Sequence, residues 1–173
     1  MKKSIGISLN GISIKFHLEN KGKDFYMVIV LAEGKDKQKI MKLDRHIPSN
    51  RLGECIWQGQ VYVLKDDSIK NGGKNHRVKN PIVGVLRYSL FWQTIPFLDL
   101  LYIEESYRNK GFGTQMMKKW EETMKLCGYS YVMTSTQADE DAWKFYEKLG
   151  YWRKGGFFPP EQEAEEWIYW KQL

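Results

Sequence analysis

The stretch "LDLLYIEESYRNKGFGTQMM", residues 98–117, runs from apolar residues through a basic loop into helix-forming residues. The apolar run predicts a strand that ends near Ile103, and residues 114–127 predict an amphipathic helix. Two glycines in the loop permit positive φ and close approach to the backbone. A helix N-terminus with exposed amides favours anions. The spacing matches neither a dinucleotide-binding fingerprint nor a P-loop, so an ordinary strand-to-helix turn stays an alternative.

Length and composition predict a single globular domain over residues 1–173. Hydrophobic residues make up 42% of the chain, a globular composition. No apolar run approaches the roughly 18 residues of a membrane span, and the N-terminus has no signal-peptide pattern. The two cysteines, Cys55 and Cys127, show no disulfide or metal-site spacing. We therefore expect a cytoplasmic protein that binds neither a metal nor a membrane.

The formal net charge is +6, and basic proteins often bind nucleic acid. Here the basic residues are dispersed and acidic residues interrupt most of them, which favours a solvated surface. Nucleic-acid binding is therefore not expected, although it stays the alternative that charge alone suggests.

The remaining segments predict a layered α/β (α+β) fold with a mixed, mostly antiparallel central sheet flanked by helices. Asp139 is expected to cap the last helix, whose apolar stripe includes Tyr146 and which Gly150 ends. The expected strands are 4–19, 25–34, 60–64, 82–91, 97–103, 129–135 and 165–173; the expected helices are 37–47, 51–59, 114–127 and 139–149; residues 65–81 are expected to form a loop, and 150–158 a returning segment.

Two motifs carry a resemblance to a known family. Residues 98–117 resemble the acetyl-CoA-binding motif of the GCN5-related N-acetyltransferase (GNAT) family: Arg or Gln, two residues, Gly, one residue, then Gly or Ala after a central strand. The segment "TSTQADEDAWKFYEKLGY", residues 134–151, resembles the family's second signature, a helix with Phe-Tyr four residues before a Gly-aromatic pair. The resemblance covers roughly residues 82–157, and it implies the family's fold and an acetyl-CoA-dependent N-acetyltransferase.

The resemblance also implies roles for individual residues. Tyr146 matches the tyrosine that protonates the departing thiolate. The backbone of Leu101, Tyr102 and Ile103 would pair with the pantetheine arm of coenzyme A. Asp139 stands where many members have an asparagine near the pantetheine. The pyrophosphate would be held by the loop residues Arg108, Asn109, Lys110, Gly111, Phe112, Gly113 and Thr114.

The amine acceptor must lose a proton before or during its attack, and Asp99 is the candidate base. It is the one acidic residue of the run 97–103. Burial in such a strand would favour the protonated carboxyl, and its position resembles that of an aspartate in aminoglycoside 6'-N-acetyltransferases. The alternatives are a water chain as the base and a structural ion pair between Asp99 and Arg87.

The acceptor itself is an unidentified primary amine, and Tyr88 and Trp92 are candidates to line its site. Cys127 is a poor nucleophile candidate, because it is expected at the buried end of its helix, which predicts direct transfer. The expected partners are coenzyme A and the amine, and a homodimer stays open. A non-catalytic acyl-CoA-binding module is the alternative function.

Overall fold

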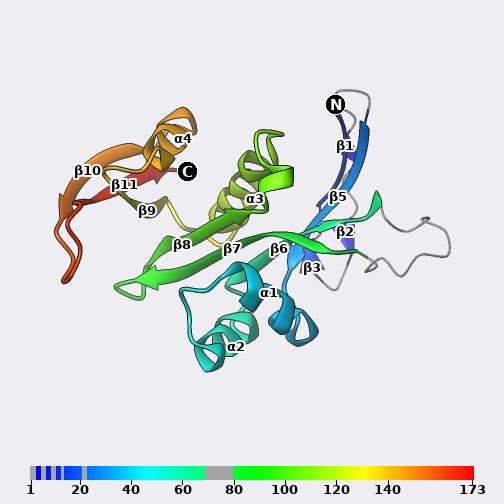
Figure 1. The fold of residues 1–173 in the computed structure, drawn as a ribbon, viewed down its shortest axis with the longest axis horizontal. Coiled ribbons are helices and arrows are strands. Elements are labelled where there is room, and N and C mark those ends of the chain that lie inside the picture. The colour runs from blue at the N-terminus through cyan, green and yellow to red at the C-terminus, as the bar shows by residue number, and fades with distance from the viewer. Residues whose placement is uncertain (1–2, 5–6, 9–10, 13, 21–22, 69–79) are drawn as a thin grey trace. The chain divides into compact units, whose positions relative to one another are not determined.

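The computed structural model describes residues 3–4, 7–8, 11–12, 14–20, 23–68 and 80–173. They form two compact units, the first within 1–87 and 100–119, the second from 88–99 and 120–173. The single domain expected for 1–173 stays a prediction. The elements (Figure 1) are β1 Lys3–Ser4, β2 Ile7–Ser8, β3 Gly11–Ile12, β4 Ile14–Asn20, β5 Lys23–Leu31, α1 Lys37–Leu43, α2 Ser49–Trp57, β6 Val61–Asp66, β7 Ile82–Phe91, β8 Ile95–Ile103, α3 Phe112–Leu126, β9 Tyr131–Gln137, α4 Ala142–Lys148, β10 Trp152–Phe157 and β11 Glu166–Gln172.

The first unit contains an antiparallel meander. Its strand order is β1-β4-β5-β6-β7-β8, and β4–β5, β5–β6 and β6–β7 pair antiparallel. On β5 the side chains of Phe25, Met27 and Ile29 are buried, while Tyr26 is exposed and Val28 half-buried. This alternation is what a strand with one covered face produces.

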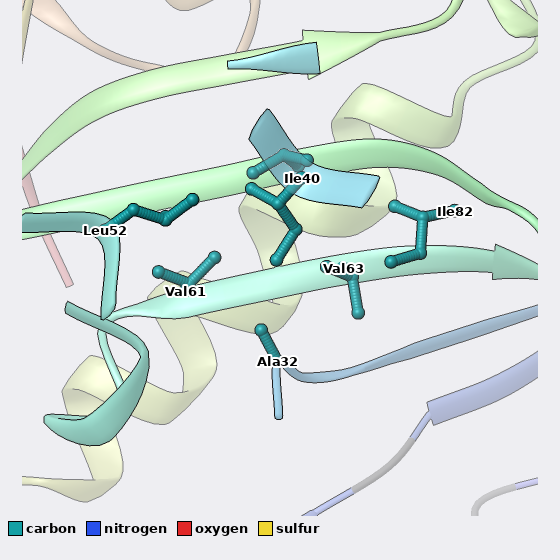
Figure 2. Close-up of a cluster of buried hydrophobic side chains, with 7 residues drawn as sticks. Ala32, Ile40, Leu52, Val61, Val63 and Ile82 are labelled. Carbon is teal, nitrogen blue, oxygen red and sulfur yellow. The ribbon is translucent and has the colours of Figure 1, made fainter. Parts of the chain in front are cut away.

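Helices α1 and α2 pack against the meander through one apolar cluster. Ile40 of α1 and Leu52 of α2 are fully buried and meet Val61 and Val63 of β6 (Figure 2). Burying an aliphatic side chain of this size contributes about 1.5 to 3 kcal/mol, so this cluster anchors two short helices that would be marginal alone.

The second unit contains a parallel pair of strands. Its strand order is β7-β8-β9-β11-β10; β8 pairs with β9 in parallel, and β9–β11 and β11–β10 pair antiparallel. The predicted fold class, a mixed and mostly antiparallel sheet with helices, is confirmed. The buried side chains of this unit include Trp120, Met124, Val132, Tyr146, Tyr151 and Tyr169.

One predicted helix was too long. Helix α1 ends at Leu43 rather than at residue 47, because Asp44 takes an extended conformation. The buried Asp44 carboxylate accepts a hydrogen bond from Arg87 Nε at 2.8 Å and another from the His46 amide at 3.1 Å. This non-local partner turns the chain away from the helix, and no local periodicity reveals it. Ile47 still packs against the apolar cluster.

Other boundaries moved less. The predicted loop 65–81 begins later, because β6 extends to Asp66, and its centre lies outside the described residues. The returning segment 150–158 contains the exposed strand β10. Helix α3 begins at Phe112, two residues before the predicted start.

Candidate active site

The loop before α3 belongs to the first unit and has the expected open backbone. After β8, a 3₁₀ turn over Glu105–Tyr107 leads into Asn109 and Gly111, whose φ angles are +57° and +81°. A Cβ added to Gly111 would meet no heavy atom within 4 Å. Of the two glycines that permit positive φ, only Gly111 uses it, because Gly113 lies inside α3.

The first turn of α3 presents backbone donors. The Gln115 amide donates to the Gly111 carbonyl at 3.1 Å, so the amides of residues 112–114 precede this intrahelical bond. In a helix of 15 residues such amides carry the positive end of the macrodipole. The arrangement fits an anion such as a pyrophosphate.

Two cations beside this turn are folded against the loop. Arg108 Nε donates to the Ile103 carbonyl at 2.9 Å, and the guanidinium lies 5.5 Å from the Tyr102 ring centroid. Lys110 Nζ donates to the Ser106 carbonyl at 2.5 Å. These hydrogen bonds hold the side chains of Arg108 and Lys110 against the loop, so the loop carries two positive charges.

An aromatic cluster that the sequence did not reveal supports the loop. Phe112 is buried, with its ring centroid 5.8 Å from that of Phe25 and 6.2 Å from that of Tyr107. The Tyr107 hydroxyl donates to Asp66 Oδ2 at 2.8 Å, and burial together with this bond raises the pKa of Tyr107. The sequence did offer a signal for Phe112, which is an apolar residue between two glycines. No sequence pattern pointed to Asp66.

Strand β8 carries the residues expected at the pantetheine arm. Leu101 and Tyr102 are half-buried and Ile103 is buried. In the second unit, the parallel register pairs Phe97 with Met133 and Leu98 with Thr134. Leu101 to Ile103 lie beyond this register, and their expected backbone pairing with the pantetheine arm stays a prediction.

Tyr146, in the second unit, is both a core residue and a polar one. It is 8% exposed, and its ring lies 5.8 Å from Tyr151 and 6.4 Å from Tyr169, measured between centroids. Burial raises the pKa of Tyr146 above its ordinary value of 10, so the phenol is protonated at neutral pH.

Asp99 is exposed, and the expectation that it is buried was wrong. Its Oδ1 accepts a hydrogen bond from Ser89 Oγ at 2.9 Å. Asp99 therefore belongs to an open part of the sheet, where its carboxylate is reachable from solvent. The alternative role for Asp99, a structural ion pair with Arg87, stays a prediction, because the two residues belong to different units.

The two acceptor-site candidates do not share a location. Because successive side chains of a strand alternate between faces, Tyr88 points away from the face that carries Ser89 and Asp99. Its ring centroid lies 5.8 Å from that of Trp120, a core residue. Trp92, 78% exposed in the turn after β7, stays a candidate for a pocket rim.

Three other expectations need correction or restriction. The N-cap of α4 is Asp141 rather than Asp139, which is exposed in the preceding turn. Cys127 is exposed, so the burial argument against it as a nucleophile was wrong. The polar segments around His46 and His76 predict surface positions for both; His46 is exposed, and His76 lies outside the described residues.

The described part of the chain has neither a cluster of metal-binding side chains nor a helix that could span a membrane. No group of three or more His, Cys, Asp or Glu residues within those ranges could hold a metal ion. None of the helices described above is long and apolar enough to cross a membrane.

The first turn of α3 lies in the first of the two family-like motifs, residues 98–117, and the buried Tyr146 lies in the second, residues 134–151. A model of the acetyltransferase (GNAT) family matches residues 41–151. The chain belongs to this family. It is accordingly an N-acetyltransferase, and its acetyl donor is acetyl-CoA. A search of curated proteins found no match to this sequence.

Solved structures share the acetyltransferase fold at low identity. Naa50 from Arabidopsis thaliana, with the bisubstrate analogue CoA-Ac-MVNAL, is 14% identical over 85% of this chain and 99% of its own, with a TM-score of 0.66. The Escherichia coli ribosomal-protein-S18-alanine N-acetyltransferase is 13% identical over 85% and 94%, with a TM-score of 0.65. A putative streptothricin acetyltransferase from Bacillus anthracis, with acetyl coenzyme A, is 19% identical over 65% and 61%, with a TM-score of 0.53.

Proposed function

We propose that this acetyltransferase moves the acetyl group directly from acetyl-CoA to a primary amine, without a covalent acyl-enzyme. The acceptor is a small molecule such as an aminoglycoside or a polyamine, or an amine of a protein. The observation that carries the proposal is the buried side chain of Tyr146 on α4, because a phenol keeps its proton at neutral pH and can donate it.

On the donor side, we assign the pyrophosphate of coenzyme A to the first turn of α3. The amides of residues 112–114 and the open backbone at Gly111 support this assignment. Arg108 and Lys110 add countercharge. The backbone of Leu101 to Ile103 would pair with the pantetheine. Asp139 would contact the pantetheine only as an acceptor, because a carboxylate has no proton to donate.

Acetyl-CoA supplies the acetyl group as a thioester. The amine attacks its carbonyl carbon, and the thiolate of coenzyme A leaves. Tyr146 would give its proton to that sulfur, and such proton transfer typically contributes 10²- to 10⁴-fold to the rate. Since burial raises the pKa of this phenol, the proton is present throughout the neutral range.

On the acceptor side, Asp99 would remove the amine's proton or pair with its ammonium form. The exposed carboxylate, held by Ser89, supports both roles. The exposed Trp92 would line the rim of the site, with its ring 4.6 Å from that of Phe91. Tyr88 would act only by packing beneath the site.

The experiment is a panel of amines with acetyl-CoA, read by release of free thiol. The panel contains a peptide with a free N-terminus, the same peptide blocked at the N-terminus but carrying a lysine, an aminoglycoside and a polyamine. Thiol release with one of them identifies the acceptor class. Tight coenzyme A binding without release from any amine would instead favour the non-catalytic module.

We also propose a cytoplasmic location and no role in nucleic-acid binding. The dispersed positive charge supports the second statement. A titration of duplex DNA at increasing salt checks it, because phosphate contacts would weaken binding steeply as salt rises. Whether the enzyme is a homodimer is open to measurement by its mass in solution.

A further inference from the structure

A row of apolar side chains crosses the sheet of the second unit, one from each strand. The ring centroids of Phe91 on β7 and Phe97 on β8 lie 5.9 Å apart, and the register places Phe97 opposite Met133 of β9. Met133 lies opposite Trp170 of β11, which in turn lies opposite Trp152 of β10. Residues directly opposite each other on neighbouring strands point to the same face of the sheet. We call these five side chains the apolar row.

The helices of this unit contact the other face of the sheet. Helix α4 does so through Tyr146, whose ring centroid lies 6.4 Å from that of Tyr169. Helix α3 does so through Glu121, whose Oε2 lies 2.7 Å from Lys171 Nζ. Tyr169 and Lys171 are the sequence neighbours of Trp170, so their side chains point away from the face that carries the apolar row.

The apolar row is open to solvent. Phe91 is 38% and Trp152 70% exposed, and Phe97, Met133 and Trp170 are partly exposed. With roughly 150 to 250 Å² for each large side chain, these fractions leave roughly 300 to 500 Å² of apolar surface. An exposed patch of this size is often a binding site, but each partner of a stable dimer buries about 800 Å². The row therefore fits a small molecule or the end of a peptide better than a second copy of the chain.

One charge of each sign lies beside the row on the same face. Asp99 is exposed and is two residues past Phe97 on β8, so both side chains point to one face. Lys154 Nζ lies 4.9 Å from the ring centroid of Trp170. The strands that carry the two charges, β8 and β10, are three spacings apart in the sheet, about 14 Å. A ligand on the row therefore meets a carboxylate at one end and an ammonium group at the other.

We propose that the acceptor is an amine with a single positive charge on an apolar body. Its nitrogen lies at Asp99, and its body covers Phe97, Met133 and Trp170. This inference rests on the proposed acetyl transfer and on the role of Asp99 in it. As the bond from nitrogen to the acetyl carbon forms and the thioester C–S bond breaks, the ammonium loses two protons; one ends on the sulfur and one in solvent.

The same features disfavour two of the acceptor classes. A polyamine brings further positive charges toward Lys154, which repel it. An aminoglycoside does the same and also places polar groups on the apolar row, where they lose water without gaining a hydrogen bond. An apolar monoamine avoids both costs, and a carboxylate at its far end would meet Lys154 favourably.

The first experiment compares three probe amines with acetyl-CoA by release of free thiol. They are phenethylamine, ethylamine, which lacks only the ring, and spermidine. The kcat/KM for phenethylamine should exceed that for ethylamine about tenfold, the scale of covering one aromatic ring. Spermidine should be used no better than ethylamine, although it offers two primary amines.

The second experiment removes a ring from the row. Trp170→Gln should lower kcat/KM for phenethylamine about tenfold and for ethylamine much less, with the KM for acetyl-CoA unchanged. Trp57→Gln is the matched control, because Trp57 is 87% exposed at the end of α2 in the first unit. It should alter neither value. A merely structural role of Trp170 would instead lower the values for both amines alike.

A charge reversal tests the other end of the row and does not depend on Trp170→Gln folding. Lys154 is exposed, so Lys154→Glu should fold. It should raise kcat/KM for spermidine about threefold at low salt, and the gain should vanish at high salt because salt screens exposed charges. Lys148→Glu, at an exposed position of α4, makes the same change in net charge and should have no such effect.

The outcomes separate this inference from the proposed function. Thiol release with equal kcat/KM for ethylamine and phenethylamine, or a preference for spermidine, overturns the inference and leaves acetyl transfer intact. No thiol release from any amine overturns both. A wild-type mass of two chains in solution that falls to one chain in Trp170→Gln would show that a second copy covers the row, and would also overturn the inference.

Discussion

Replacing Gly111 by alanine tests whether the turn before α3 holds the pyrophosphate. Gly111 has φ +81°, and an added Cβ would meet no heavy atom within 4 Å. A left-handed backbone costs an L-residue about 1 to 2 kcal/mol. The smaller conformational entropy of alanine in the unfolded chain offsets about 0.4 to 1 kcal/mol of this. The free protein should therefore lose roughly 1 kcal/mol, and its Tm should fall by about 2 to 4 °C.

Coenzyme A binding should fall by more than this small strain explains. If a phosphate approaches the backbone at Gly111, the new methyl group occupies its space. We expect the Kd measured by isothermal titration calorimetry to rise at least about tenfold, which corresponds to about 1.4 kcal/mol. The thermal melt of the same sample shows that the variant is folded.

Gly59 provides the control for strain. It follows α2, has φ +70°, and a Cβ there would also meet nothing within 4 Å. Gly59→Ala should lower the Tm by a similar amount and leave the Kd for coenzyme A unchanged. A folded Gly111→Ala variant with wild-type affinity would refute the reasoning, since the phosphate would then sit elsewhere. Equal loss of affinity in both variants would mean that backbone strain, not occupied space, was the cause.

Three further predictions concern proton transfer and pH. Tyr146→Phe should lower kcat on the order of 10²-fold with little change in acetyl-CoA affinity; steady-state kinetics and calorimetry check this, and a full rate would return Tyr146 to a purely structural role. Asp99→Asn should remove the acidic limb of the pH profile of kcat/KM while coenzyme A still binds; an unchanged profile with a lowered Tm would indicate a structural ion pair instead. Burial raises the pKa of Tyr107, Tyr146 and Tyr151 above 10 in the folded chain. The unfolded chain therefore releases protons first, so the free energy of unfolding should be insensitive to these groups below about pH 10 and fall above it. Urea unfolding between pH 8 and 11 measures it, and a stability that does not fall above pH 10 would contradict these shifts.

Several features followed from local sequence because local physics decides them. The apolar spacing of residues 114–127 predicted α3, since a helix buries one face at steps of three and four. Gly150, with φ +85°, ends α4 as expected, and Gly128, with φ +88°, follows α3 in the same way, because few other residues adopt that backbone. The two glycine-containing motifs were enough to indicate the family.

Contacts between distant residues decided the rest. Asp44 and Arg87 are 43 positions apart in sequence, so no window of sequence shows why α1 ends at Leu43. The bond between Tyr107 and Asp66 spans 41 positions and was equally hidden.

Asp99 shows the limit of periodicity most clearly. Its apolar neighbours predicted burial, yet burial depends on whether another element covers that face, and the carboxylate is exposed. Thr134 and Thr136 are the same residue type, two positions apart on one buried face. Only the placement of the Leu98 carbonyl beside the first of them gives that hydroxyl its partner on β8, while the hydroxyl of the second has none among the described residues. Residue type sets what a side chain is able to do, and the three-dimensional neighbourhood selects which of those things it does.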